Sequence, residues 1–416
     1  MKKLLTNAKI IDFKNNKFKD VDILINDNVI EQIFEKSENF AQNYAKFIDF
    51  NEIETINCKN NIILYGFINS SSSLIKNFFE SFVSNLTLEE FNEKFETFFN
   101  NLKIEEKYVI YKFQILNLIK NGIVTFCDED NFNLALKKAV KETKINSVFR
   151  LGYKNCFDDF DANIVEKCVK ENQDFVFSLG GVLLNSEENF EEIIKLSKKY
   201  NKPVFVGGSQ NLFEAGTVEI EFNKTCTEIL QNYGVMDVDH VILNNNVLDK
   251  QDYEILSENN SKLIYSPSLN LTLGNKNANI YALEKTNLIG LSSFKNNYDL
   301  EMFLTNNLEN ESYNKIETFS ATKIYEFATK NNAQILGLKS QGEIKSGQLA
   351  NLLIVQNDNI FSDANSFLKN FETSKINSVF INGELVYNSN HFVFINDYEH
   401  LKQLCFSLTK KYQITK

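Results

Sequence analysis

The chain has 416 residues, a formal net charge of −11 and an apolar fraction of 43%. This length exceeds one ordinary domain and allows a large barrel with an appendage, and the apolar fraction is sufficient for a sizeable core. The acidic balance and the lack of a basic stripe argue against nucleic acid as a partner. Polar residues interrupt the first apolar run after Leu5, so we expect no signal peptide and no membrane contact, and we predict a cytoplasmic protein.

The N-terminal part of the sequence predicts β-structure. Alternating apolar and polar residues favour strands, and Asn26-Asp27-Asn28 is a turn signal between two of them. The polar stretch 37–56 is typical of a hairpin or a surface insertion. The expected strands are 4–12, 21–25 and 29–33.

The middle of the chain alternates short apolar runs with amphipathic segments of helix length. This alternation predicts parallel βαβ units, and about eight units over this length indicate a (β/α)8 barrel. The clearest helices are expected at 106–121 and 187–200. The apolar runs interpreted as barrel strands cover 122–127, 174–179, 203–206, 240–243, 262–265 and 288–290.

The C-terminal part again predicts strands, at 350–355 and 378–387, and Asn382-Gly383 is a typical two-residue hairpin turn. The fold class is therefore α/β, with two domains. Residues 1–60 and 341–416 are expected to form a small β-sandwich from both chain ends, and residues 61–340 a (β/α)8 TIM barrel.

Four consecutive serines follow the apolar run that begins at Ile62. The run ends in Gly66-Phe67-Ile68-Asn69, and Ser70 to Ser73 come next. This segment resembles the first barrel strand of the amidohydrolase superfamily, P-G-F-I-N-x-H-x-H, whose two histidines bind the catalytic metal. Ser71 and Ser73 stand at those two positions.

Three further segments carry the same resemblance, which extends over nearly the whole chain. Residues 122–128 resemble the family pattern G-x-T-T-x-x-D, 328–338 resemble A-T-x-x-G-A-x-x-L-G-L, and 342–352 resemble G-x-I-x-x-G-K-x-A-D-L. The chain is most similar to the subgroup that deaminates methylthioadenosine, S-adenosylhomocysteine and aminofutalosine. The resemblance implies a barrel hydrolase of carbon–nitrogen bonds that often forms homodimers.

The family's chemical motifs are replaced where they align with this sequence. The substrate-contacting H-A-P-Y falls on 180–183, and H-x-x-E, a ligand plus the acid/base glutamate, falls on 207–210. Three later motifs, A-H-x-x-x-L, H-C-P-x-S-N and G-T-D-G-x-x-S-N, fall on 243–248, 265–270 and 290–297. The former ligand positions are Ser71, Ser73, Gly207, Asn244 and Ser292, and the glutamate position is Gln210.

Serine and asparagine side chains are poor ligands for zinc or iron, which prefer imidazole, thiolate and carboxylate. We therefore predict no metal, no cofactor and no retained catalytic residue, with Gln210, Tyr265 and Ser292 as degenerate catalytic positions. A neutral, hydrogen-bonding pocket is expected at the barrel mouth. Its predicted lining is Ser71, Ser73, Gly180, Gly207, Gln210, Asn244, Tyr265, Ser292 and Asn297.

Three functions follow as hypotheses. The first is a catalytically inactive amidohydrolase homologue that binds a neutral small molecule or a protein partner, as a homodimer or with an active homologue. The second is an enzyme with relocated, metal-independent chemistry built from Gln210, Tyr265, Cys127 or the acids at 128–130. The third is a family hydrolase whose activity is inferred from the resemblance alone.

Other reactive side chains have simpler interpretations. Asp128, Glu129 and Asp130 are typical of a solvated loop. The three histidines, at 240, 391 and 400, are interpreted as surface or packing residues, and Cys127 as a packed thiol. The six cysteines form no C-x-x-C pair and are expected to be reduced: Cys58, Cys127, Cys156, Cys168, Cys226 and Cys405.

Overall fold

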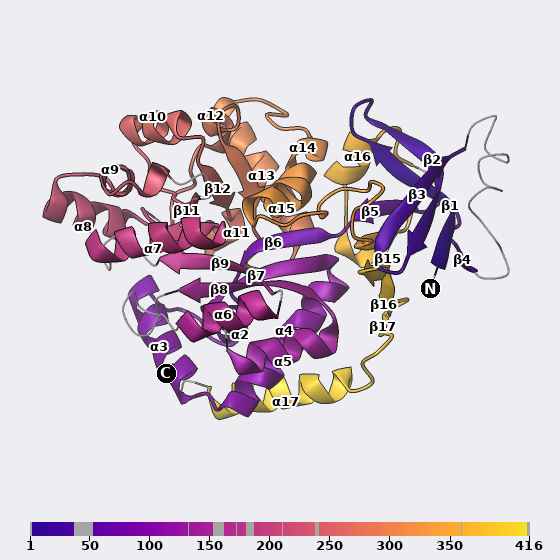
Figure 1. Cartoon of the computed structure of the whole chain (residues 1–416), viewed down its shortest axis with the longest axis horizontal. Helices are drawn as coiled ribbons and strands as arrows, with labels where there is room; N and C mark the ends of the chain where they lie inside the picture. The colour runs from indigo at the N-terminus through magenta and orange to yellow at the C-terminus, as the bar shows by residue number, and fades with distance from the viewer. Residues whose placement is uncertain are drawn as a thin grey trace.

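Two sheets organise the computed structural model, which describes residues 2–36, 53–131, 133–152, 162–171, 173–179, 187–209, 211–237, 241–358 and 360–413. One sheet has eight parallel strands in chain order and forms the predicted barrel, covered by helices. The other combines strands from both chain ends, as Figure 1 shows by its indigo and yellow strands. The predicted fold class is confirmed.

The barrel strands are short and almost fully buried, because helices cover one face and the barrel interior the other. Such strands read as continuous apolar runs, which explains why the sequence pattern located most of them. The barrel strands are β6 (Phe67–Ser72), β7 (Ile123–Asn131), β8 (Asn146–Gly152), β9 (Asp174–Leu179), β10 (Val204–Gly207), β11 (Val241–Asn244), β12 (Lys262–Tyr265) and β13 (Leu288–Leu291).

Side chains bridge the seam between the first and last barrel strands. Asn332 donates from Nδ2 to the carbonyl oxygens of Ile68 in β6 and Leu291 in β13, both at 2.6 Å. Gly290 allows this approach, because a Cβ there would lie 2.2 Å from Asn332 Oδ1. The seam therefore fixes β6 against β13 at the end of the barrel where Ser71 and Ser292 lie.

The sheet of the chain ends has nine strands. The predicted Asn-Gly turn joins β15 and β16, with positive φ at Asn382 and Gly383, as a type I′ hairpin requires. Most of the predicted insertion, 37–52, lies outside the described residues, and 53–57 is a strand paired with β1. The strands are β1 (Lys2–Asp12), β2 (Lys17–Asn26), β3 (Val29–Glu35), β4 (Ile53–Asn57), β5 (Ile62–Tyr65), β14 (Leu352–Val355), β15 (Ile376–Ile381), β16 (Glu384–Asn388) and β17 (His391–Phe392).

The helices cover the outside of the barrel, and the last of them returns to it from the end sheet (Figure 1). α17 contacts α4, where Lys411 forms an ion pair with Glu106 at 2.6 Å. None of the described helices is long and apolar enough to cross a membrane. The helices are α2 (Leu74–Glu80), α3 (Leu88–Asn101), α4 (Ile104–Lys120), α5 (Leu134–Thr143), α6 (Ala162–Lys170), α7 (Glu187–Tyr200), α8 (Leu212–Phe222), α9 (Cys226–Asn232), η2 (Val235–Asp237), α10 (Lys250–Glu258), α11 (Pro267–Thr272), α12 (Ile280–Leu283), α13 (Tyr298–Tyr313), α14 (Ala321–Glu326), η3 (Phe327–Asn331), α15 (Asn332–Ile335), α16 (Ala364–Lys369), η4 (Thr373–Lys375) and α17 (Tyr398–Lys411).

Candidate functional site

The predicted site residues lie where barrel strands end. Gly207, Asn244 and Tyr265 are the last residues of β10, β11 and β12, and Ser292 follows β13 directly. Parallel strands bring their carboxyl ends to one end of a barrel, which we call the barrel mouth. Gly180 and Gln210 lie outside the described residues.

A carboxylate joins the two serines that stand at the metal-ligand positions of the first strand. Ser71 Oγ donates to Glu129 Oε1 at 2.9 Å, and Ser73 Oγ donates to Glu129 Oε2. The hydroxyls of Ser71, in β6, and Ser73, just after it, are therefore both directed toward one acidic side chain of the neighbouring strand β7.

A guanidinium contacts the same serine. Arg150 of β8 donates from Nη2 to Ser71 Oγ at 2.9 Å, and only 5% of the residue is exposed. Its guanidinium carbon lies 3.8 Å from the centre of the Phe205 ring. Ser71 thus accepts from the cation and donates to Glu129, which links opposite charges through one hydroxyl.

The alternation of β7 separates the three acids at its end. Glu129 points to the barrel interior, whereas Asp128 accepts from the backbone N–H of Leu74 at 3.0 Å and Asp130 accepts from the Tyr111 hydroxyl. Leu74 and Tyr111 belong to helices outside the barrel. The interpretation of 128–130 as a solvated loop is wrong, because the residues continue a strand and Asp128 is 2% exposed.

The environment shifts the pKa values of Glu129 and Asp128 in opposite directions. Burial alone would raise the pKa of Glu129, but the charges of Arg150 and Lys76 and the two serine hydroxyls lower it below its usual value. Burial and the nearby charge of Asp130 raise the pKa of Asp128 well above its usual value. The ionisable side chains of Glu129 and Arg150 both lie at the mouth, so the predicted uncharged lining is wrong at this point.

Ser292, at the former aspartate position, forms hydrogen bonds across the junction between β13 and β6. Its hydroxyl lies 3.1 Å from Asn69 Oδ1 and also contacts the backbone oxygen of Ser71. Asn69 donates from Nδ2 to Ser293 O at 2.8 Å. Asn297 accepts from the backbone N–H of Leu300 and caps α13, so its side chain has a structural role.

Tyr265 and Asn244 are buried at the mouth. The Tyr265 hydroxyl finds no hydrogen-bond partner within the described ranges, and burial raises the pKa of this tyrosine. Asn244 is 6% exposed and lies beside Gly207 in the pairing of β10 and β11. Among the described residues, Ser71 hydrogen-bonds to Glu129 and Arg150 and not to Tyr265 or Asn244, so these positions share an end of the barrel rather than one hydrogen-bond network.

The remaining nucleophiles and histidines do not form a catalytic group. Cys127 is fully buried, and burial raises the pKa of its thiol although the nearby Arg150 acts in the opposite direction. The five described cysteines are free and buried, and Cys156 lies outside the described residues. His391 and His400 are exposed, as predicted, and His240 lies outside the described residues.

A divalent metal ion does not fit this donor set. The hydroxyls of Ser71 and Ser73 are engaged by Glu129, and a cation is bonded to Ser71. Zinc and iron need imidazole, thiolate or carboxylate ligands in number. Within the part of the chain that the structure describes, no three His, Cys, Asp or Glu side chains are grouped to hold a metal.

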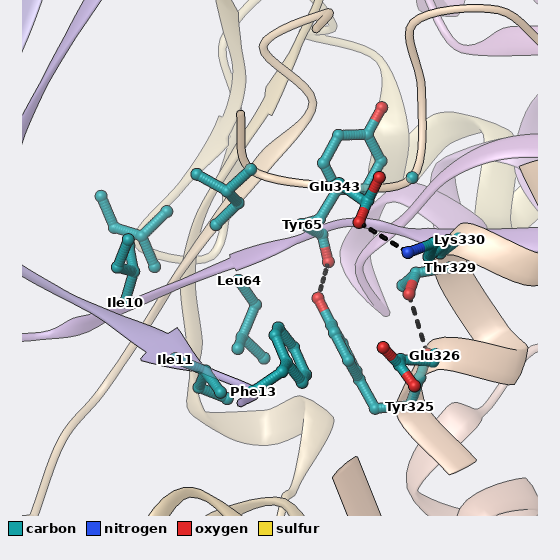
Figure 2. Close-up of a pocket in the computed structure, with 13 residues that line it drawn as sticks. Ile10, Ile11, Phe13, Leu64, Tyr65, Tyr325, Glu326, Thr329, Lys330 and Glu343 are labelled. Atoms are coloured by element: carbon teal, nitrogen blue, oxygen red, sulfur yellow. Dashed lines mark hydrogen bonds and ion pairs between the residues drawn. The ribbon is translucent and has the colours of Figure 1, made fainter. Parts of the chain in front are cut away.

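A separate pocket lies between the end sheet and the barrel (Figure 2). The Phe13 ring stacks on Tyr325 with centroids 5.7 Å apart, and the Tyr325 hydroxyl donates to Tyr65 O at 2.7 Å. Lys330 and Glu343 form an ion pair at 3.0 Å on its rim. Tyr65 precedes β6, so this pocket lies at the opposite end of that strand from Ser71, and we interpret it as the joint between the two sheets.

The comparison with known families agrees with this architecture. The model of the amidohydrolase family matches residues 68–386, which include all eight barrel strands except the first residue of β6. The chain belongs to the amidohydrolase family.

Curated relatives of similar length are named as deaminases. The chain is 29% identical to a 5'-deoxyadenosine deaminase from Methanococcus aeolicus, over 92% of this chain and 93% of the relative. It is 24% identical to a 5-methylthioadenosine/S-adenosylhomocysteine deaminase from Caldicellulosiruptor saccharolyticus, over 96% of each. The resemblance to this subgroup is confirmed.

Solved structures share the fold. An adenosine deaminase from Xanthomonas campestris, solved with bound zinc, superposes with a TM-score of 0.89 over 99% of this chain and 98% of its own, at 14% identity. A guanine deaminase from C. acetobutylicum gives a TM-score of 0.73 over 93% of this chain and 100% of its own, at 18% identity.

The sequence analysis missed Arg150 as a member of the site, and it named Glu129 only among the acids at 128–130 of the second hypothesis. One signal was present, because Arg150 is the single arginine of a chain with 44 Lys and Arg residues. All the other residues of that set are lysines, which indicates that position 150 requires a property that only a guanidinium has. A planar guanidinium stacks on a ring and donates in a fixed fork, which an ammonium does not.

Proposed function

We propose that this protein is a catalytically inactive member of the amidohydrolase family that works by binding. The observation that carries the proposal is the hydrogen-bonded group of Ser71, Ser73, Glu129 and Arg150 at the metal position of the first strand. In this group the two hydroxyls and the carboxylate already bind one another and Arg150 contacts Ser71, so the group is a poor metal site, and without a bound metal the pKa of a water there would not be lowered.

The proposed ligand is a neutral small molecule. Glu129 and Arg150 are linked through Ser71, so a charged ligand would find its partner charge already engaged. The relatives named as deaminases of 5'-deoxyadenosine and methylthioadenosine make neutral purine nucleosides the first compounds to test. A homodimer, or a complex with an active homologue, is the proposed alternative to a small-molecule ligand.

The first expected result concerns metal content. Protein purified without an affinity metal and dialysed is expected to hold far less than one zinc, iron or nickel per chain, because hydroxyl and amide oxygens leave such a cation underbonded. Elemental analysis measures this directly. About one metal per chain after dialysis contradicts the proposal.

The second expected result concerns catalysis. Ammonia release from 5'-deoxyadenosine, methylthioadenosine and S-adenosylhomocysteine is expected to equal the rate without protein, because the residues that would hold a metal-bound hydroxide are replaced and glutamine stands at the acid/base position 210. Turnover that persists through further purification and is lost in Gln210→Ala contradicts the proposal and favours relocated chemistry. A thermal shift with the same nucleosides tests for binding, and the absence of any shift favours a protein partner.

A further inference from the structure

We propose that Arg150 is the resident cation of the barrel mouth and excludes a divalent metal ion from the space beside Ser71, Ser73 and Glu129. The inference builds on the proposed function, since a metal-dependent catalyst would need that space. It adds a cause: the site excludes metal through an added cation as well as through missing ligands.

Arg150 lies beside the side chain at which the family binds its metal. The Arg150 Nη2 atom lies 2.9 Å from Ser71 Oγ, and a metal bound through an imidazole at residue 71 would lie about 2 Å from the ligand nitrogen. Both cations would therefore occupy the space next to the same side chain. Two positive charges beside one side chain repel strongly in a site that is largely removed from solvent.

The surroundings of Arg150 fit a planar guanidinium. Phe205 stacks against the guanidinium, Ser71 accepts from Nη2, and only 5% of Arg150 is exposed. Its Nε has no hydrogen-bond partner among the described residues. This is a position built around a planar cation, and the cation is the one arginine of the chain.

Glu129 is the counter-charge of Arg150 in this group. The Glu129 carboxylate accepts from both serines, and Arg150 donates to one of them, so the carboxylate has this cation close by. Once Arg150 is removed, that carboxylate is free to bind another cation. With two imidazoles it would complete a His2Glu set, the three protein ligands of a catalytic zinc site with its fourth position open.

The test introduces histidines with and without the arginine. The double variant Ser71→His/Ser73→His is expected to bind zinc weakly and to remain inactive, and adding Arg150→Met is expected to tighten zinc binding about tenfold or more. Adding Arg150→Lys instead keeps a positive charge and is expected to leave binding weak. Zinc affinity is measured by competition with a chromophoric chelator.

Each outcome decides. Equal zinc affinity with Arg150 and with Met at position 150 overturns the inference, even if the natural chain is metal-free and inactive as proposed. Zinc in the natural chain overturns the proposed function instead. In the variant with Met at position 150, Glu129→Gln is expected to weaken zinc binding again, and unchanged binding contradicts the role given to Glu129.

A second measurement covers the case in which the histidine variants do not fold. In the natural background, Arg150→Ala is expected to lower the melting temperature, and millimolar methylguanidinium is expected to restore part of it, with methylammonium as the matched control. No loss on Arg150→Ala, or equal rescue by the two ions, overturns a specific guanidinium site.

Discussion

Arg150→Met is expected to lower the free energy of unfolding by about 3 kcal/mol, because it leaves the half-buried Glu129 carboxylate without its cation. Glu129 would keep its two serine donors but lose the charge that holds its pKa down. Glu129→Gln is expected to have a similar cost, since the guanidinium, 5% exposed, would then lack its counter-charge. Urea unfolding at pH 7 measures both.

The double variant Glu129→Gln/Arg150→Met distinguishes a charge pair from two independent packing residues. The loss of unfolding free energy in the double variant is expected to be well below the sum of the two single losses, because the neutral pair leaves no charge without a partner. Lys250→Met is the control, since Lys250 pairs with Glu254 on the surface and such pairs contribute about 0.5 kcal/mol. Strictly additive losses contradict the linkage through Ser71.

The fold was predictable because its signals are local. Buried parallel strands appear as short apolar runs, and the helix predicted at 187–200 is α7 with those bounds. The strand at 53–57 was missed, because its residues are mostly exposed and carry polar side chains. The turn at Asn382-Gly383 was predictable because two positive φ angles select those residue types.

The centre of the site was less predictable, because it depends on which way each side chain points. The family pattern identified Ser71 and Ser73 but said nothing of the residues that replace a metal. Glu129 lies in a run of three acids, and only the register of β7 directs it inward while Asp128 and Asp130 face the helices. Arg150 was detectable as the single arginine, yet its contact with Ser71 requires β8 to lie two strands away from β6 in the barrel.

Glu129 and Arg150 also explain how the barrel mouth is stabilised after the loss of the metal ligands. Replacement of histidines by serines alone would leave a polar gap, in which unpaired groups are costly. Here the two hydroxyls have a carboxylate to bind and one of them accepts from a cation, so the mouth is stabilised without a metal. This is why we expect restored histidines to fail while Arg150 remains.

Glu301→Gln is expected to stabilise the protein at pH 8 by up to about 3 kcal/mol and to have little effect at pH 5. Glu301 is fully buried in α13, and burial raises its pKa from 4.5 to about 7, although Ser268 donates to it from its backbone N–H at 3.1 Å and from its hydroxyl. The folded chain therefore holds a proton that the unfolded chain has released. Stability falls as the pH rises from about 4.5 to 7 and stays low above that range.

Glutamine suits the same contacts without the charge, because its amide oxygen accepts from the Ser268 N–H and its NH₂ donates to the Ser268 hydroxyl. Urea unfolding at pH 5, 6, 7 and 8 compares the variant with the natural chain. Glu309, whose pKa burial also raises to about 7, keeps part of the pH slope in the variant. Glu258→Gln, at an exposed position of α10, is the matched control and is expected to follow the natural chain at every pH. A Glu301→Gln variant that also follows it shows that Glu301 is ionised in the folded protein at no cost, contrary to the effect that burial has on its pKa.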